Sequence, residues 1–313
     1  MRTPFLSFTR KGRPPAEPQI FSASAADNLR GSLLMTLSVA AFICNDALMK
    51  AVTQSLPLYE AIAIRGGMVL LTMMLVAQAQ GGLRLRVPSS DVGPLALRTL
   101  ADVASTVLYL LALRRMALAD ISAIMQALPL AVTLAAALFF GERLGWRRVL
   151  AIGIGFAGVL LILRPGTGAF DQWSAVALTA MMLIVLRDMV TRTFSTRVGS
   201  SAVAFYAALA VMLAGIVLGW AEGWRSPTVA ELALLALAAL FLTVGYITAV
   251  ATMRVGEISF VAPFRYTSLV WAVVLGLVIF GEWPDAWTWA GASLVVGAGI
   301  YTILRERKLQ RTV

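Results

Sequence analysis

Phe140-Gly141-Glu142 closes one long apolar stretch of the chain, and the same three residues return as Phe280-Gly281-Glu282 at the end of another. A longer match lies upstream of each copy. Residues 116–122 read Met-Ala-Leu-Ala-Asp-Ile-Ser, and residues 253–259 read Met-Arg-Val-Gly-Glu-Ile-Ser. The separations are 140 positions (140 to 280) and 137 positions (116 to 253). Such similar separations indicate that one apolar unit occurs twice.

The repeat extends toward the N-terminus. Asp46 and Lys50 are four positions apart, and Asp188 and Arg192 repeat this spacing 142 positions later (46 to 188). One apolar unit has therefore been used twice, with small insertions. An internally repeated apolar chain is typical of membrane transporters, because two similar halves can move around a site at their interface.

The composition indicates an integral membrane protein. Of the 313 residues, 59% are hydrophobic and only 13% are charged, whereas about a quarter of a soluble domain is charged. The chain has no His and a single Cys, Cys44. This excludes an internal disulfide and a His general base, and it disfavours a zinc-ligand cluster. The net charge of +10 comes from basic residues spread over loops between apolar segments, which fits membrane orientation better than nucleic-acid binding.

Ten apolar segments have roughly the 20 residues that a bilayer-crossing helix needs. The two-residue alternation of a membrane barrel is absent. The segments are 31–50, 57–79, 94–113, 118–140, 147–164, 172–191, 200–220, 230–251, 258–280 and 286–304. We therefore expect an all-α integral membrane protein with ten transmembrane helices in two inverted five-helix repeats, because an odd number of helices per repeat reverses the second copy.

Charge sets the expected orientation. Most Lys and Arg residues outside the helices fall in tails and loops on the same side as the N-terminus, which predicts that both termini are cytoplasmic. Residues 1–30 are polar and basic, without the apolar core of a signal peptide, and predict a disordered tail. We expect repeats at 31–165 and 172–305, and a second cytoplasmic tail at 306–313.

Both copies share further features. The first carries Pro129, Glu142 and Arg147-Arg148, and the second carries Pro263-Phe264-Arg265-Tyr266 before Phe280-Gly281-Glu282. With the ten apolar segments, this arrangement resembles the drug/metabolite transporter superfamily, specifically its EamA-type ten-helix members, over about residues 30–305. The resemblance implies a proton- or exchange-coupled carrier of small organic solutes. Asp46-x3-Lys50 followed by Arg65 is similar to a bacterial subgroup that includes riboflavin and S-adenosylmethionine uptake carriers.

Ionisable residues inside the predicted spans are costly and usually paired or functional. Asp46 and Lys50 lie on one helix face, so they either neutralise each other or act in substrate or proton binding. Arg65, Arg187 and Arg265 have no obvious partner in their own helix. Glu60 lies five positions before Arg65 and points to a different face, and the adjacent positions 187 and 188 project about 100° apart. Each either pairs with another helix or presents its fork to a carboxylate or phosphate.

These considerations define the candidate substrate-binding residues. We expect Arg65 and Arg265 to approach the bilayer midplane from opposite sides, with Tyr246 or Tyr266 as a stacking surface. Packing in the core or against lipid is the alternative role for each aromatic residue. The full candidate set is Arg65, Arg265, Tyr266, Tyr246, Arg187, Asp46, Lys50, Asp102 and Gln126.

Two structural roles are also expected. Glu142 and Glu282, at helix ends, favour capping or structural roles. Glycines such as Gly158 and Gly291 predict close packing of the fifth and tenth helices, at the centre or between protomers.

The sequence therefore predicts a secondary-active transporter of a small organic metabolite by alternating access, in the inner membrane of a bacterium. Riboflavin-like vitamins, nucleoside-like metabolites such as S-adenosylmethionine, and amino-acid-like solutes are the candidate substrates. Export of amino acids, drugs or toxic metabolites is the alternative. A membrane-embedded enzyme or a scaffold is disfavoured by the absence of His, the single Cys and the charges within the spans. We expect no cofactor, metal or nucleic acid, a monomer or homodimer, and no ATP-driven step because a Walker A motif is absent.

Overall fold

The computed structural model describes residues 24–79, 82, 85–141, 145–165, 171–195, 197–220, 222–255 and 257–310. Over these residues the fold is all-helical, and ten helical segments are long and apolar enough to cross a membrane. The expected fold class and number of spans are confirmed. Most of the N-terminal tail, residues 1–23, and Glu142 lie outside the described residues.

The first repeat contains α1 (Ala25–Val52), α2 (Leu58–Ala79), α3 (Ser89–Leu113), α4 (Leu118–Met125), α5 (Leu128–Phe140) and α6 (Trp146–Leu163). The second contains α7 (Gln172–Thr191), α8 (Ser200–Gly219), α9 (Val229–Val255), α10 (Ile258–Val261), the 3-10 helix η1 (Ala262–Tyr266), α11 (Thr267–Phe280) and α12 (Ala286–Gln310). Helices α4 and α5 form the fourth span, and α10, η1 and α11 form the ninth. The first and last helices of the chain, α1 and α12, extend into residues 1–30 and 306–313, which the sequence predicts to be tails.

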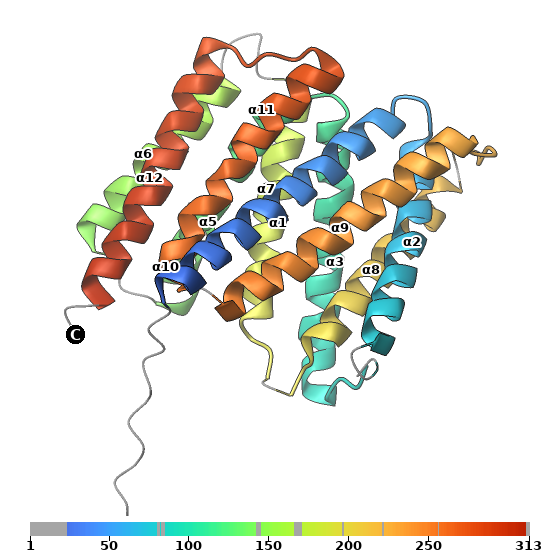
Figure 1. Cartoon of the computed structure of the whole chain (residues 1–313), viewed down its shortest axis with the longest axis horizontal. Coiled ribbons are helices and arrows are strands. Elements are labelled where there is room, and N and C mark those ends of the chain that lie inside the picture. The colour runs from blue at the N-terminus through green and yellow to red at the C-terminus, as the bar shows by residue number, and fades with distance from the viewer. Residues whose placement is uncertain are drawn as a thin grey trace, which may run out of the picture.

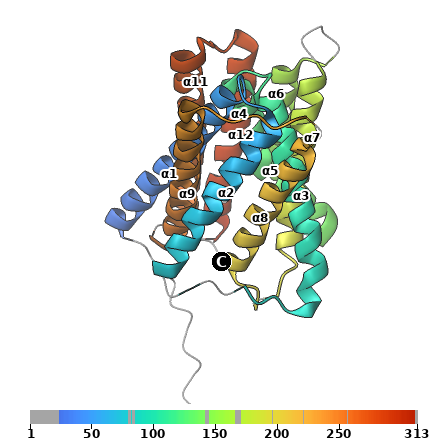
Figure 2. The same cartoon turned by 90° about the vertical axis from the view of Figure 1, so that its right-hand side faces the viewer.

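Helix packing follows the repeat. α1 packs on α9, and its counterpart α7 packs on α3, which corresponds to α9. Figure 2 shows α2 next to α9 and α8 next to α3, a second exchanged pair. α1 and α9 are antiparallel, since Ser55 bonds Glu231 at one end and Asn28 bonds the Glu257 amide at the other. The start of α1 and the end of α12 lie at the same end of the bundle, the lower end in Figure 1.

Two spans are interrupted at corresponding places, and each break has a proline in it or beside it. Pro129 has no N–H to donate to the carbonyl of residue 125, and the fourth span is broken between α4 and α5. Pro263 lies in η1, where the ninth span is broken. Each interruption lies within the span, because α5 and α11 continue the helix to residues 140 and 280.

The repeated Phe-Gly-Glu motif ends α5 and α11. Gly141 and Gly281 both adopt left-handed backbone, with φ of 68° and 67°, which glycine adopts without steric cost. At the end of α11, the Gly281 amide bonds the Leu277 carbonyl and the Glu282 amide bonds the Gly276 carbonyl. This Schellman-type ending fixes the direction in which the Glu282 side chain leaves the helix.

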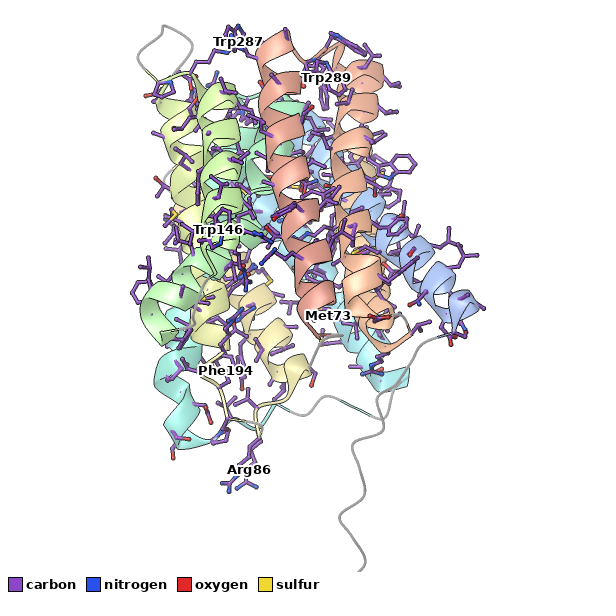
Figure 3. All side chains as sticks on the ribbon, turned by 90° about the vertical axis from the view of Figure 1, so that its left-hand side faces the viewer. Met73, Arg86, Trp146, Phe194, Trp287 and Trp289 are labelled. Carbon is purple, nitrogen blue, oxygen red and sulfur yellow. The ribbon has the colours of Figure 1, made fainter. Side chains whose placement is uncertain are left out.

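The fifth and tenth spans, α6 and α12, make the close contact expected from their glycines. A Cβ atom built on Gly158 would lie 2.6 Å from the Gly291 carbonyl oxygen. The pair forms one edge of the bundle rather than its middle (Figure 1). Figure 3 shows Trp287 and Trp289 at the upper end of the bundle and Arg86 at the lower end, consistent with aromatic residues at a membrane–water interface.

Candidate functional site

The breaks in the fourth and ninth spans contact each other. The Gln126 amide donates to the Tyr266 carbonyl oxygen at 3.4 Å and to the Ser268 hydroxyl at 2.5 Å. Gln126 and Tyr266 are each 5% exposed, and they are equivalent positions in the repeat, 140 residues apart (126 to 266). The two halves of the protein therefore meet where both helices are interrupted. In transporters built from inverted repeats, discontinuous helices of this kind lie beside the substrate and ion sites.

Four side chains form an upper polar group: Asn45, Asp46, Arg65 and Tyr109. The Tyr109 hydroxyl donates to Asp46 at 2.7 Å, and the Asn45 amide donates to the same carboxylate at 3.0 Å. Arg65, 6% exposed, donates to the Asn45 side-chain oxygen at 3.0 Å. Asn45 was not among the candidates. The sequence signal for Asn45 is a polar amide next to Asp46 within an apolar segment, which would have indicated a hydrogen-bonding partner for the buried charges.

The first of the two alternatives for Asp46 and Lys50, that they neutralise each other, is wrong. The Lys50 ammonium instead forms an ion pair with Glu282, donates to the Met116 carbonyl oxygen at 2.7 Å, and lies 4.8 Å from the centre of the Phe280 ring. Lys50 is near the end of α1, and its long side chain reaches the loop before α4 and the segment after α11. The shorter Asp46 side chain is held one turn below by Tyr109.

Glu282 has the structural role expected of it. One of its carboxylate oxygens accepts from the Leu118 amide at 2.9 Å, an otherwise free N–H at the start of α4. Its other oxygen bonds Lys50. A residue of the second repeat therefore holds α1 and α4 of the first repeat together at the upper end.

A lower charged group joins α3 and α7: Arg98, Asp102, Arg187 and Asp188. Asp102 lies 2.9 Å from Arg187 and 3.7 Å from Arg98. Arg187 also contacts Asp188, its neighbour in sequence, with N···O distances of 2.9 and 3.0 Å. The expectation that Arg187 has no partner in its own helix is therefore wrong, because the long Arg side chain reaches the carboxylate of the next residue.

Tyr246 lies between these two groups. Its side chain is 55% exposed, and its ring makes an edge-to-face contact with Phe42 at 5.3 Å. Its hydroxyl is close enough to Arg65 and to Asp102, Arg98 and Arg187 to interact electrostatically with them. The partly exposed Tyr246 side chain therefore lies near charged groups of both repeats.

Arg265 and Tyr266 occupy different environments although they are adjacent. Tyr266 is buried, and a Cβ atom built on Gly299 would lie 1.6 Å from its hydroxyl oxygen, so neighbouring helices enclose the ring. Arg265 is partly buried. Its guanidinium has no hydrogen bond or ion pair to any residue that the structure describes. Among the described carboxylates, Asp188 is the one that acts on it electrostatically.

Neither the site nor the rest of the described chain has a group of three or more His, Cys, Asp or Glu that could hold a metal ion. Among the described residues, the candidate site offers the guanidinium groups of several arginines and the exposed aromatic ring of Tyr246. Such groups can bind and release a polar solute.

Comparison with known proteins agrees with the ten-span, repeated fold. The model of the EamA-like transporter family matches residues 29–164 and 172–305. An S-adenosylmethionine uptake transporter of Rickettsia bellii is 26% identical over 58% of this chain, a match that spans 62% of that protein's length. A riboflavin transporter of Rhizobium johnstonii is 28% identical over 60% of this chain and 63% of its own.

A third relative aligns over a longer region. A pseudopaline exporter of Pseudomonas aeruginosa is 26% identical over 86% of this chain and 94% of its own. One solved crystal structure superposes with a TM-score of 0.64 at 18% identity, covering 89% of this chain and 98% of that one, and supports the fold.

Proposed function

We propose that this chain, which belongs to the EamA-like transporter family, is a secondary-active carrier that moves a small organic metabolite across a bacterial inner membrane by alternating access. The observation that carries the proposal is the meeting of the two interrupted spans, with charged side chains of both repeats beside them. A charge at mid-membrane costs about 2.5–3.5 kcal/mol on insertion scales and persists where it is paired or functional.

The relatives suggest which solutes to test. Proteins similar to this chain are named for S-adenosylmethionine, riboflavin and pseudopaline. Each name describes a small organic metabolite, and Tyr246 offers an open ring against which a flat solute can stack. Import of a vitamin or nucleoside-like solute is therefore the first candidate function, with a proton gradient or exchange as the driving force.

Export is the second candidate function, and the alignment favours it in one respect. The pseudopaline exporter matches over 94% of its own length, whereas the two uptake carriers match over less than two thirds of theirs. The same site serves both directions, because an alternating-access carrier runs along whichever gradient drives it.

Transport by the purified full-length chain tests this function. Proteoliposomes are loaded with unlabelled solute and assayed for uptake of labelled riboflavin, S-adenosylmethionine and amino acids, with and without a pH gradient. We expect saturable exchange of at least one solute, with the pH gradient separating proton coupling from exchange. Fluxes equal to those of empty liposomes for the whole panel would count against the proposal.

Arginine variants test the proposed site in the same assay. Arg65→Lys and Arg265→Lys keep the charge but lose the planar fork, so transport should fall at least tenfold while the yield of folded protein holds. Arg147→Lys, exposed at the start of α6, is the matched control. Normal transport by both site variants would show that the solute binds elsewhere.

We place both termini in the cytoplasm and treat the carrier as a monomer or homodimer. Reporter fusions at residues 86 and 310 should both report a cytoplasmic location. A periplasmic signal at either position would reverse the assigned orientation.

A further inference from the structure

The arginines near the interrupted spans are not equally paired. Arg98 and Arg187 lie within 4 Å of Asp102, and Arg187 also contacts Asp188. Arg65 is hydrogen-bonded to Asn45 and interacts electrostatically with Asp46. Arg265 differs, because no described residue forms a hydrogen bond or ion pair with its guanidinium.

Among the charged groups that the structure describes beside these arginines, one cation has no counter-charge of its own. The cations are Arg65, Arg98, Arg187 and Arg265, and the carboxylates beside them are Asp46, Asp102 and Asp188. Asp188, the carboxylate that acts on Arg265, is already in contact with Arg187. A buried charge that lacks a partner is strongly disfavoured. The excess positive charge therefore belongs to Arg265.

The position of Arg265 suits a ligand. It lies in η1, adjacent to Tyr266, whose carbonyl oxygen is held by Gln126 across the interface of the two halves. A guanidinium presents N–H groups in a planar fork that matches two oxygens of a carboxylate or phosphate. Arg265 is next to a contact between the two repeats, and its guanidinium is not occupied by a described residue. It can therefore hold an anion while the halves move.

We propose that Arg265 anchors an anionic oxygen group, a carboxylate or a phosphate, of the transported metabolite, and that this carrier selects solutes bearing such a group. The inference rests on the proposed transport function. It predicts selection by charge: a solute with the anionic group is carried, and the same solute without that group is not.

The first test needs no substrate. The unfolding midpoint of the ligand-free, full-length protein is measured in nanodiscs for Arg265→Met, Arg187→Met and the exposed, charge-matched control Arg147→Met. Removing an uncompensated cation should place Arg265→Met at or above the control. Arg187→Met should fall below it by about 4 °C or more, because two aspartates lose a partner. An Arg265→Met midpoint as low as that of Arg187→Met would overturn the proposal, since it would show that the protein already pairs Arg265.

The second test uses matched solutes in proteoliposomes. S-adenosylmethionine is compared with its decarboxylated form, and riboflavin 5′-phosphate with riboflavin. We expect at least tenfold faster transport of the anionic member of one pair. Arg265→Gln should remove that preference, and Arg147→Gln should keep it. The pair that responds tells whether the group is a carboxylate or a phosphate.

The outcomes separate the two proposals. Equal transport of both members of each pair would overturn the anion anchor while supporting the transport function. If no member of either pair is transported, these solutes are excluded as substrates of the proposed carrier. The unfolding midpoints then decide whether Arg265 lacks a counter-charge.

Discussion

Lys50 and Arg265 are both cations within membrane-spanning segments, yet their surroundings are opposite. Lys50, at the upper end of the bundle, contacts Glu282, the Met116 carbonyl and the Phe280 ring. Arg265, at the break in the ninth span, has no such contact among the described residues. A cation with all its donors directed at protein groups stabilises one arrangement of helices. A cation without such partners is available to a ligand, so the difference supports the proposal that Lys50 is structural and that Arg265 binds solute.

The two ends of the fourth span also differ in burial. Leu118, Ile121 and Ile124 of α4, at the upper end, are completely buried, whereas Leu138 and Phe139 near the lower end of α5 are 72% and 79% exposed. Further contacts between the repeats reinforce the upper end: Arg164 pairs with Asp285, and Asp120 accepts from Thr288. In an alternating-access carrier these upper contacts would have to separate before the site could open on that side.

Breaking the Lys50 pair should have the largest effect. Lys50→Met leaves the Glu282 carboxylate without its cation, and we expect a loss of about 3 kcal/mol in unfolding free energy. Glu282→Gln in the same chain should recover much of this loss, because the glutamine oxygen can still accept from the Leu118 amide. Denaturation of the purified protein measures both.

The control for this prediction is Asp46→Asn combined with Lys50→Met. It should recover nothing, because Asp46 bonds Tyr109 and Asn45 rather than Lys50. If Asp46→Asn restored stability and Glu282→Gln did not, Asp46 rather than Glu282 would be the partner of Lys50.

The tight packing of the upper half gives the next effect. Gly158→Ala places a methyl group 2.6 Å from the Gly291 carbonyl oxygen, and overpacking of this kind costs about 1–3 kcal/mol. Gly153→Ala on the same helix meets no atom within 4 Å and should leave the unfolding midpoint unchanged. Similar midpoints for the two variants would show that α6 and α12 are less closely packed.

Tyr109→Phe should have a smaller effect on the upper polar group. It removes the hydroxyl that donates to Asp46 at 2.7 Å, and a hydrogen bond to a charged group contributes about 1.5–3 kcal/mol. Because Asn45 still donates to Asp46, we expect the lower end of this range. Tyr206→Phe, which loses a bond to the Leu85 carbonyl oxygen outside the group, is the comparison in the same denaturation assay. A loss no larger than that of Tyr206→Phe would contradict the assignment.

The smallest effect on folding is expected at Tyr246, which we propose contacts the solute. Tyr246→Phe keeps the exposed ring, so stability should change by less than about 0.5 kcal/mol. Tyr246→Leu should retain folding but lower transport of a flat solute, because stacking on the ring is lost. Equal transport by the Phe and Leu variants would show that this ring does not contact the solute.

Much of the fold could be predicted from the sequence because the governing signals are local. Runs of about 20 apolar residues specify spans, and most predicted ends fall within a few residues of the helices. Pro129 and Pro263 mark the interrupted spans, and the repeated Phe-Gly-Glu motif marks two helix ends. The charge pattern also identified Asp46, Arg65, Asp102, Arg187 and Arg265 as candidates.

The sequence by itself thus determined that the chain is a repeated, ten-span membrane protein with costly charges inside its helices, whereas only the tertiary structure decided how those charges are paired. Lys50 and Asp46 satisfy the four-residue rule for neighbours on a helix, yet Lys50 pairs with Glu282, 232 residues away, and Asp46 with Tyr109, 63 residues away. The physical reason is that helix periodicity fixes only the face on which a side chain lies. The partner is set by which helix packs against that face, by the reach of each side chain and by the donors and acceptors available there.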